Sequence, residues 1–237
     1  MLLARRVPLI LAVLWFQPAV AADLGGPPPA AVVVNVPPPL FYGAVRGGGV
    51  WTSDTTVTAS ASIGVADVSY DRPGATVSGA IGFYLDRLLG EAPGLRGELE
   101  VGWLSRDVGR MSFADDPDSS GAGQGSLSTT YAMTSLYYDL TRDGILTPFV
   151  GAGAGVAEHS FKDHGTALSG PVVHSRTTNW IFHATAGVEV KLTDRWSLEG
   201  AYRFLATPKA TPVDVDGTRQ HIELLDHLVT VGARVNF

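Results

Sequence analysis

The sequence predicts an all-β protein, an eight-stranded antiparallel up-and-down transmembrane β-barrel, and three observations lead to this prediction. Residues 228–237 alternate apolar with small or polar residues at a period of two, and most of seven earlier segments show a similar alternation. Long and short connections between these segments also alternate. Mean hydropathy is +0.15 and only 17% of residues are charged, an average typical of strands whose alternate residues face lipid.

The N-terminal residues have the features of export and linker segments. Residues 1–21 combine Arg5 and Arg6 with an apolar stretch at 9–16 and small residues at 19–21, which predicts a secretory signal peptide. The apolar stretch is too short to cross a bilayer as a helix. Two proline triplets in 22–39 favour polyproline II, which forms no sheet, so this segment is predicted to be a periplasmic leader. We expect this leader either to be disordered or to contact the cell wall or a partner.

The barrel is predicted to occupy residues 40–237, and its first four strands are expected at 40–51, 75–86, 95–104 and 128–140. The first strand is rich in glycine and carries Arg46 on one face. In the next three, polar or charged residues alternate with an apolar set, which comprises Val77, Ile81, Phe83, Leu85, Leu95, Leu99, Val101, Trp103, Leu136, Tyr138 and Leu140. A period of two with one apolar face is typical of strands in a sheet.

The last four strands are expected at 146–157, 180–192, 196–205 and 221–237. In the fifth strand Gly151, Gly153 and Gly155 alternate with small apolar residues, and we expect these glycines to make room for bulky neighbours inside the barrel. The eighth strand ends on Phe237 and is predicted to close the barrel against the first strand, which removes both sheet edges.

The connections follow the pattern of outer-membrane barrels. Long polar loops are predicted at 52–73, 105–126, 158–175 and 206–220, and short turns near 89–94, 141–144 and 193–195. Outer-membrane barrels have long extracellular loops and short periplasmic turns. The sequence therefore predicts four surface loops.

The polar face is expected to line the lumen, where charges must pair because an isolated ion away from water is costly. This predicted lumen ion-pair network contains five basic and four acidic residues: Arg46, Arg96, Glu98, Glu100, Glu189, Lys191, Glu199, Arg203 and Arg234. The near balance predicts a plugged or very narrow barrel. In a soluble barrel the same charges would be solvated surface. Aromatic residues on the apolar face are predicted to lie at the two membrane interfaces, namely Trp103, Trp180, Trp196, Phe204 and Phe237, with Tyr138 beside them.

Four short motifs together resemble a known family. They are Ala21-Ala22-Asp23-Leu24 ahead of the leader, Thr-Pro-Phe-Val-Gly-Ala-Gly-Ala-Gly at 147–155, Leu-Glu-Gly-Ala-Tyr-Arg-Phe at 198–204, and Val235-Asn236-Phe237. In this order they are similar to the small porin-like surface barrels of alphaproteobacteria, related in fold to the transmembrane barrel of outer membrane protein A. The resemblance implies an eight-stranded outer-membrane barrel with mostly structural roles and supplies no catalytic residues. Since the sequence ends at the barrel, we do not expect anchoring to the wall through a peptidoglycan-binding domain.

The residue patterns predict no enzyme, cofactor or metal site. His159-Ser160 and His174-Ser175 are adjacent pairs, and neighbours in a strand point to opposite faces, which is poor geometry for activating a nucleophile. The histidines of 158–175, together with His221 and His227 beside the last strand, match no compact zinc spacing and are expected to be solvated, whereas His183 is expected to face the lumen. The acidic run Asp115, Asp116 and Asp118 lacks the spacing of a calcium loop.

The sequence thus predicts a structural outer-membrane barrel that contributes to envelope integrity. A narrow channel for small solutes, or an adhesin or ligand binder that acts through its loops, remains an alternative. The expected partners are outer-membrane lipid, lipopolysaccharide and the barrel-assembly machinery. The formal net charge of −6 and the absence of a basic patch exclude nucleic acid as an expected partner.

Overall fold

The computed structural model describes residues 39–53, 55–58, 65–69, 73–90, 93–113, 118, 120–141, 144–166, 170–210 and 222–237. The predicted signal peptide, nearly all of the predicted leader, and Asp115 and Asp116 lie outside these residues. Within the described part of the chain, no helix is both long and apolar enough to cross a membrane.

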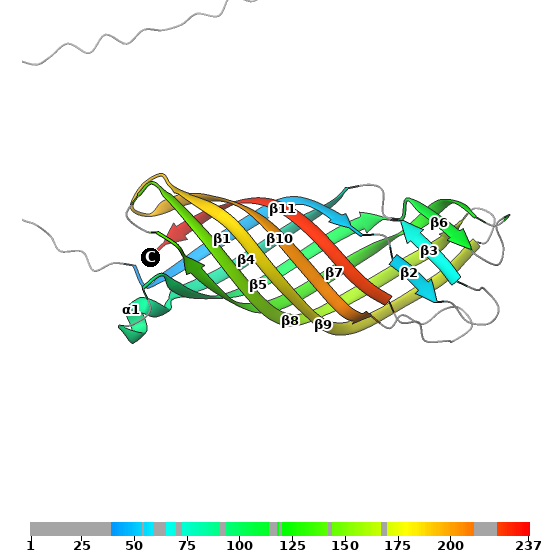
Figure 1. Ribbon diagram of the computed structural model, residues 1–237, viewed down its shortest axis with the longest axis horizontal. Helices are drawn as coiled ribbons and strands as arrows, with labels where there is room; N and C mark the ends of the chain where they lie inside the picture. Colours follow the sequence, from blue (N-terminus) through cyan, green and yellow to red (C-terminus); the bar gives the residue numbers. More distant parts are fainter. Residues whose placement is uncertain are drawn as a thin grey trace, which may run out of the picture. The chain divides into compact units, whose positions relative to one another are not determined.

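Eight antiparallel strands of the described residues close into a barrel, which confirms the predicted fold class (Figure 1). They are β1 (Phe41–Thr52), β4 (Gly74–Tyr84), β5 (Leu95–Asp107), β7 (Gly121–Asp139), β8 (Leu146–Thr166), β9 (Gly170–Lys191), β10 (Trp196–Ala210) and β11 (Ile222–Asn236). Each pairs with the strand before and after it in this order, and β11 pairs with β1 to close the wall. Because every barrel strand has two neighbours, the barrel leaves no open edge.

The closing pair is β1 with β11, as predicted. Its register places Val45 opposite Ala233 and Tyr42 opposite Asn236. The ladder extends to the last residue, because the amide of Phe237 donates to the carbonyl of Phe41 at 3.0 Å and the amide of Phe41 donates back at 3.2 Å. The terminal residue is therefore part of the barrel wall.

All four predicted long loops prove to be partly strand. Short strands β2 (Thr55–Thr58), β3 (Val65–Ser69) and β6 (Arg110–Phe113) pair in sequence and join the start of β7. Residues predicted as the third loop instead continue β8 and β9, and β10 runs on into the predicted fourth loop as far as Ala210. These extensions have polar residues on both faces, so the apolar alternation disappears although the ladder continues.

The two ends of the barrel differ in their connections. The chain terminus and the short turns lie at one end, together with helix α1 (Leu85–Leu89), which replaces the end of the predicted second strand (Figure 1). Gly90 ends this helix with a left-handed φ of 70°, a conformation that suits glycine. Strands β2, β3 and β6 lie at the other end. By the pattern of outer-membrane barrels, the first end is periplasmic and the second extracellular.

The outer face of the wall carries a band of exposed apolar side chains. Val45, Ile81, Val101 and Val231 are between 61% and 70% exposed. Side chains in alternate positions point inward and are buried. A continuous apolar band of this size on the outside suits lipid rather than water.

Candidate functional site in the barrel lumen

Three lumen tyrosines lie flat against the wall because each faces a glycine on the neighbouring strand. The register pairs Tyr42 with Gly82, Tyr131 with Gly102 and Tyr137 with Gly151. A Cβ at any of these glycines would overlap the tyrosine ring. The glycine therefore leaves space for the ring, and the tyrosine hydroxyl reaches the charged groups at the centre of the lumen.

Arg46 of β1 lies at the centre of these charges. Its guanidinium donates two hydrogen bonds of 2.7 Å to Glu98, one of 2.7 Å to Glu100, and one to Glu199. Arg46 is 5% exposed, and these three carboxylates are no more than 5% exposed. Charges buried to this extent require such direct pairing.

Arg203 of β10 provides a second contact to Glu100. It binds both oxygens of that carboxylate, and its NH2 group donates to the Tyr137 hydroxyl at 3.0 Å. Tyr131 adds a hydrogen bond of 2.8 Å to the same carboxylate. Glu100 thus has donors from three other strands, which ties opposite sides of the barrel together.

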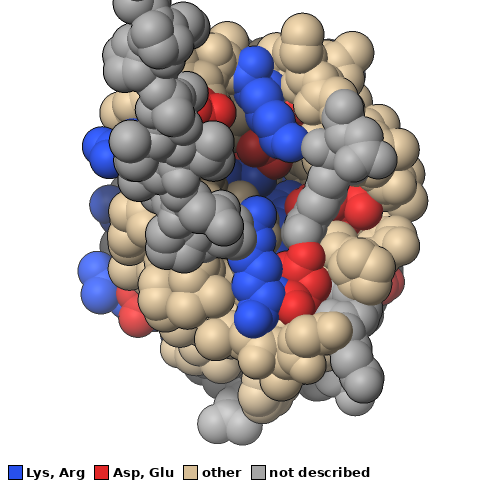
Figure 2. Space-filling view, turned by 90° about the vertical axis from the view of Figure 1, so that its left-hand side faces the viewer, with Lys and Arg blue, Asp and Glu red and all other residues tan. Residues whose placement is uncertain are grey.

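Arg234 and Arg96 extend the network toward the periplasmic end. Arg234 binds Glu189 and donates to Glu199 at 2.6 Å. Arg96 donates to Asp139 at 3.0 Å, and its guanidinium carbon lies 4.4 Å from the centre of the Tyr137 ring. Figure 2 shows acidic and basic side chains gathered around the hollow at this end.

The structure brings eight of the nine residues of the predicted network together inside the barrel. Lys191 is the exception, because β9 ends at this residue and its side chain is exposed. Asp139 takes part although sequence reasoning did not assign it to the network. Asp139 lies two positions after Tyr137 in β7, so both side chains point inward, and this alternation could have identified Asp139 from the sequence.

An apolar layer crosses the lumen on the extracellular side of this network. Eight side chains, each no more than 3% exposed, form it: Val50, Leu104, Tyr131, Met133, Ala157, Ile181, Leu205 and Leu228. They come from β1, β5, β7, β8, β9, β10 and β11. Sequence reasoning did not find this layer, because its members occur at the same inward positions as the charged residues.

A second polar group of side chains lies beyond the apolar layer. Asp226 accepts a hydrogen bond of 2.6 Å from Thr52, and its carboxylate is 3.1 Å from the guanidinium of Arg106. His159 is fully buried and its Nδ1 lies 2.9 Å from the Thr129 hydroxyl. The prediction of a solvated His159 was wrong, because β8 continues through this position and turns the imidazole into the lumen.

The other histidine predictions have different outcomes. His183 is 5% exposed in the lumen, between the hydroxyls of Ser135 at 2.7 Å and Thr185 at 2.9 Å. Ser160 lies next to His159 in β8 but is half-buried on the other face, so this pair has no nucleophile geometry. The side chains of His164, His174 and His221 lie outside the described residues. The prediction of a solvated His227 was wrong, because this residue is half-buried in β11 and its Nδ1 lies 2.6 Å from the Tyr202 hydroxyl.

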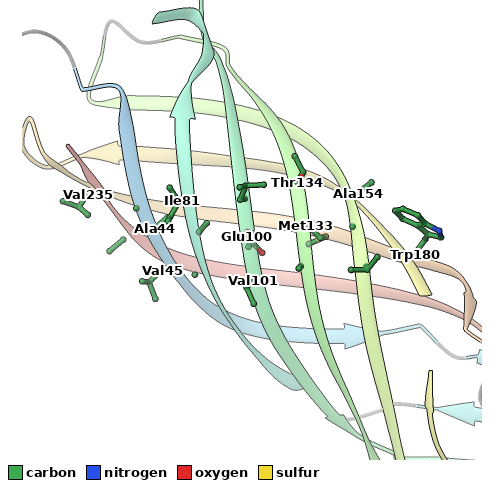
Figure 3. Close-up of a pocket in the computed structure, with 18 of the residues that line it drawn as sticks. Ala44, Val45, Ile81, Glu100, Val101, Met133, Thr134, Ala154, Trp180 and Val235 are labelled. Carbon is green, nitrogen blue, oxygen red and sulfur yellow. The ribbon is translucent and has the colours of Figure 1, made fainter. Parts of the chain in front are cut away.

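The predicted interface aromatics lie on the outer face. Trp103, Trp180, Trp196 and Phe237 are exposed by 41% to 66%, whereas Phe204 is half-buried against His227. An apolar groove follows the outer wall between Trp180 and Trp196, and Figure 3 shows the side chains around it. The groove is lined by large residues such as Ile81 and Val101 and by small ones, Gly43, Gly79, Ala132 and Ala154.

Comparison with known proteins agrees with this architecture. Residues 50–237 match the family described as outer membrane protein beta-barrel domain. The chain belongs to this family. Its members are outer-membrane barrels, and this barrel is therefore a protein of the bacterial outer membrane. A comparison with curated protein sequences finds no significant match.

Solved structures with the same fold are distant in sequence. The outer membrane protein AlkL, solved in DMPC lipid bilayers, has a TM-score of 0.53 at 18% identity over 84% of this chain and 91% of its own. OprG from Pseudomonas aeruginosa gives 0.52 at 10% identity over 84% and 98%. The outer membrane protease OmpT from Escherichia coli gives 0.51 at 11% identity over 85% and 98%. At such identities the likeness shows the fold alone.

Proposed function

We propose that this protein is a structural outer-membrane barrel with a sealed lumen that contributes to envelope integrity. The observation that carries the proposal is the pair of stacked lumen layers, one of four arginines with five carboxylates and one of eight apolar side chains. The eight-stranded barrel is narrow enough for side chains to fill it.

The energetics of the two layers favour a closed barrel. A continuous water path would require the apolar layer to separate and the buried pairs to break. Removing one partner from a buried ion pair typically costs about 3–5 kcal/mol. Arg46 and Glu100 each bind several partners, so a path through the centre would disrupt more than one pair.

The outer face of the barrel has features that support contact with the expected partners. The exposed apolar band suits outer-membrane lipid, and the exposed Trp103 and Trp180 on one side and Trp196 and Phe237 on the other suit the two interfaces. Lipopolysaccharide would then surround the extracellular end. The strand that ends in Phe237 would engage the barrel-assembly machinery. The resemblance of the four motifs to the porin-like surface barrels of alphaproteobacteria supports assigning the protein to that group.

Two measurements test the proposal. Proteoliposomes that contain the purified barrel should not swell in isotonic solutions of small sugars, because the lumen passes no solute. A strain without the protein should become sensitive to detergents and bile salts, and the wild-type gene should restore resistance. Swelling of wild-type vesicles, or unchanged resistance in the deletion strain, would contradict the corresponding half of the proposal.

The extracellular sheet supports a second, surface-exposed role for the loops. Strands β2, β3 and β6 with the start of β7 form a platform beyond the apolar band. An adhesin or ligand-binding role would be lost when residues 55–69 are deleted, while the heat-dependent gel shift of the folded barrel stays. Loss of adhesion only upon unfolding of the whole barrel would contradict this role.

A further inference from the structure

Three polar side chains form a hydrogen-bonded chain on the lipid-facing side of the wall. The hydroxyl of Tyr202 lies 2.6 Å from Nδ1 of His227, and Nε2 of the same imidazole lies 3.3 Å from the hydroxyl of Ser53. Tyr202 is 48% exposed, and both other residues are half-buried. These contacts lie outside the barrel and take no part in the lumen layers.

Neighbouring strands hold the three side chains in place. His227 of β11 lies opposite Trp51 of β1 and opposite Phe204 of β10. The Phe204 ring packs on the imidazole with a centroid distance of 5.3 Å. The amide of Ser53 donates to the carbonyl of Leu225 at 2.9 Å, which continues the ladder past the end of β1.

The lumen side of the same strand segment is also fixed. Thr52 and Asp226 are the immediate neighbours of Ser53 and His227, and their side chains hydrogen-bond inside the barrel at 2.6 Å. Both are buried. A site that must hold two reacting groups in register benefits from such support on the opposite face.

The order of the contacts is that of an activated nucleophile. With the imidazole proton on Nδ1, that N–H donates to the Tyr202 oxygen and Nε2 accepts from the Ser53 hydroxyl. A nucleophile, a base and a third group that orients the base are the general signature of serine hydrolysis. The 3.3 Å contact to Ser53 is long, as such contacts commonly are without substrate.

The position of this chain indicates the class of substrate. Tyr202, one of its members, is 48% exposed, and Trp51 beside it is 46% exposed; both lie toward the extracellular end of the apolar band. Exposed tryptophan and tyrosine sit at the headgroup level of a membrane, which is where the ester bonds of lipids meet water. On the outer face of β1 below Trp51, Gly43 and Gly47 present no side chain and flank the exposed Val45, and Gly43 lines the groove of Figure 3. This apolar surface can contact an acyl chain.

We propose that Ser53 and His227 hydrolyse acyl esters of outer-leaflet lipids, with Tyr202 as a positioning residue. The Ser53 oxygen bonds to the ester carbonyl carbon as its proton passes to Nε2 of His227. Cleavage of the carbon–alkoxy bond then releases the lipid alcohol, which takes that proton. Water attacks the acyl-serine with His227 again accepting a proton, and the fatty acid leaves as the Ser53 hydroxyl is restored. The substrate is the acyl ester of either a glycerophospholipid or a glycolipid.

The test uses the full chain refolded from inclusion bodies, so that no envelope hydrolase is copurified. A fluorophosphonate probe should label the wild type, and peptide mass spectrometry should place the label on Ser53. Vesicles of glycerophospholipid and vesicles of lipopolysaccharide, supplied separately, should show which ester is cleaved by release of fatty acid. Ser53→Ala should abolish labelling and release, and His227→Asn should lower both by about 100-fold or more.

The matched control is Ser128→Ala, because Ser128 is also half-buried on the outer face but its hydroxyl lies 3.5 Å from that of Ser105 rather than beside an imidazole. This variant should keep full labelling. Tyr202→Phe should keep the fold, shown by the gel shift on heating, and should move the pH profile of fatty-acid release. Absence of wild-type labelling, a label on another residue, or equal release by Ser53→Ala would overturn the proposal and leave the three side chains as an interface hydrogen-bond chain.

Discussion

Replacing Arg46 with methionine should strongly destabilise the barrel. Arg46 makes four charge-assisted hydrogen bonds to Glu98, Glu100 and Glu199. Each such bond is worth about 1.5–3 kcal/mol. The loss is smaller than their sum because every carboxylate keeps another donor, for example Tyr42 on Glu98 at 2.9 Å. Breaking buried pairs by removing one partner typically costs about 3–5 kcal/mol, and this is the expected fall in unfolding free energy.

Urea unfolding of the refolded barrel in lipid vesicles, followed by tryptophan fluorescence, measures this change. Lys191→Met is the matched control, since Lys191 is exposed at the end of β9, and it should stay within about 0.5 kcal/mol of wild type. Adding Glu98→Gln to Arg46→Met should recover part of the loss because it neutralises one uncompensated carboxylate. A loss below about 1 kcal/mol for Arg46→Met, equal to that of the lysine control, would refute the reasoning.

Three further variants test other parts of the fold. Gly102→Val should lower the unfolding free energy by about 1–3 kcal/mol in the same urea assay, because the valine side chain would overlap the Tyr131 ring. Its control, Gly79→Val, has open space around the added Cβ and should not destabilise the barrel. Equal losses for the two variants would contradict the packing argument. Leu104→Ala should lower the unfolding free energy by about 2–5 kcal/mol because it leaves a cavity in the apolar layer. Leu99→Ala, at an outward-facing position, should lower it much less. A larger loss for Leu99→Ala than for Leu104→Ala would contradict a core inside the barrel. Deletion of Phe237 should lower the yield of inserted barrel, read from heat-dependent gel mobility, since it removes the last pair of ladder bonds; an unchanged yield would show that these bonds are dispensable.

The strands within the membrane could be predicted from the sequence because lipid acts on every second residue. In β4 and β5, Val77, Ile81 and Val101 mark the outer face, and the same alternation in β11 predicted its pairing with β1. Beyond the membrane this constraint is lost. The residues of β8 around Ser160 and Lys162 meet water on the outside, so the sequence there resembles a loop although the ladder continues.

The composition of the lumen was only partly predictable. Alternation places Arg46, Glu98 and Glu199 inside, but their pairing depends on the strand register, which the alternation alone does not give. Leu104 and Leu228 occupy inward-facing positions of the same alternation as the charged residues, so the sequence did not distinguish the apolar layer from the ion-pair network. Lys191 was misplaced because the exact end of β9 decides whether a side chain points into the lumen or into solvent.

The contacts between Ser53, Tyr202 and His227 could not be predicted either. Their positions in the sequence are far apart, and only the closure of β1 on β11 and the register of β10 bring them together. Each residue type is common in loops and at interfaces. The three residues can therefore be recognised as one site only in the folded barrel.

The proposal of a sealed lumen is tested most directly by the electrical conductance of the purified protein in a planar bilayer. The two lumen layers predict no stable conductance steps for the wild type across concentrated KCl, under conditions where a general porin gives large steps. Protein insertion is verified in the same bilayer by recovery of the folded, heat-modifiable form. Large and stable conductance steps from the folded wild-type protein would contradict the account.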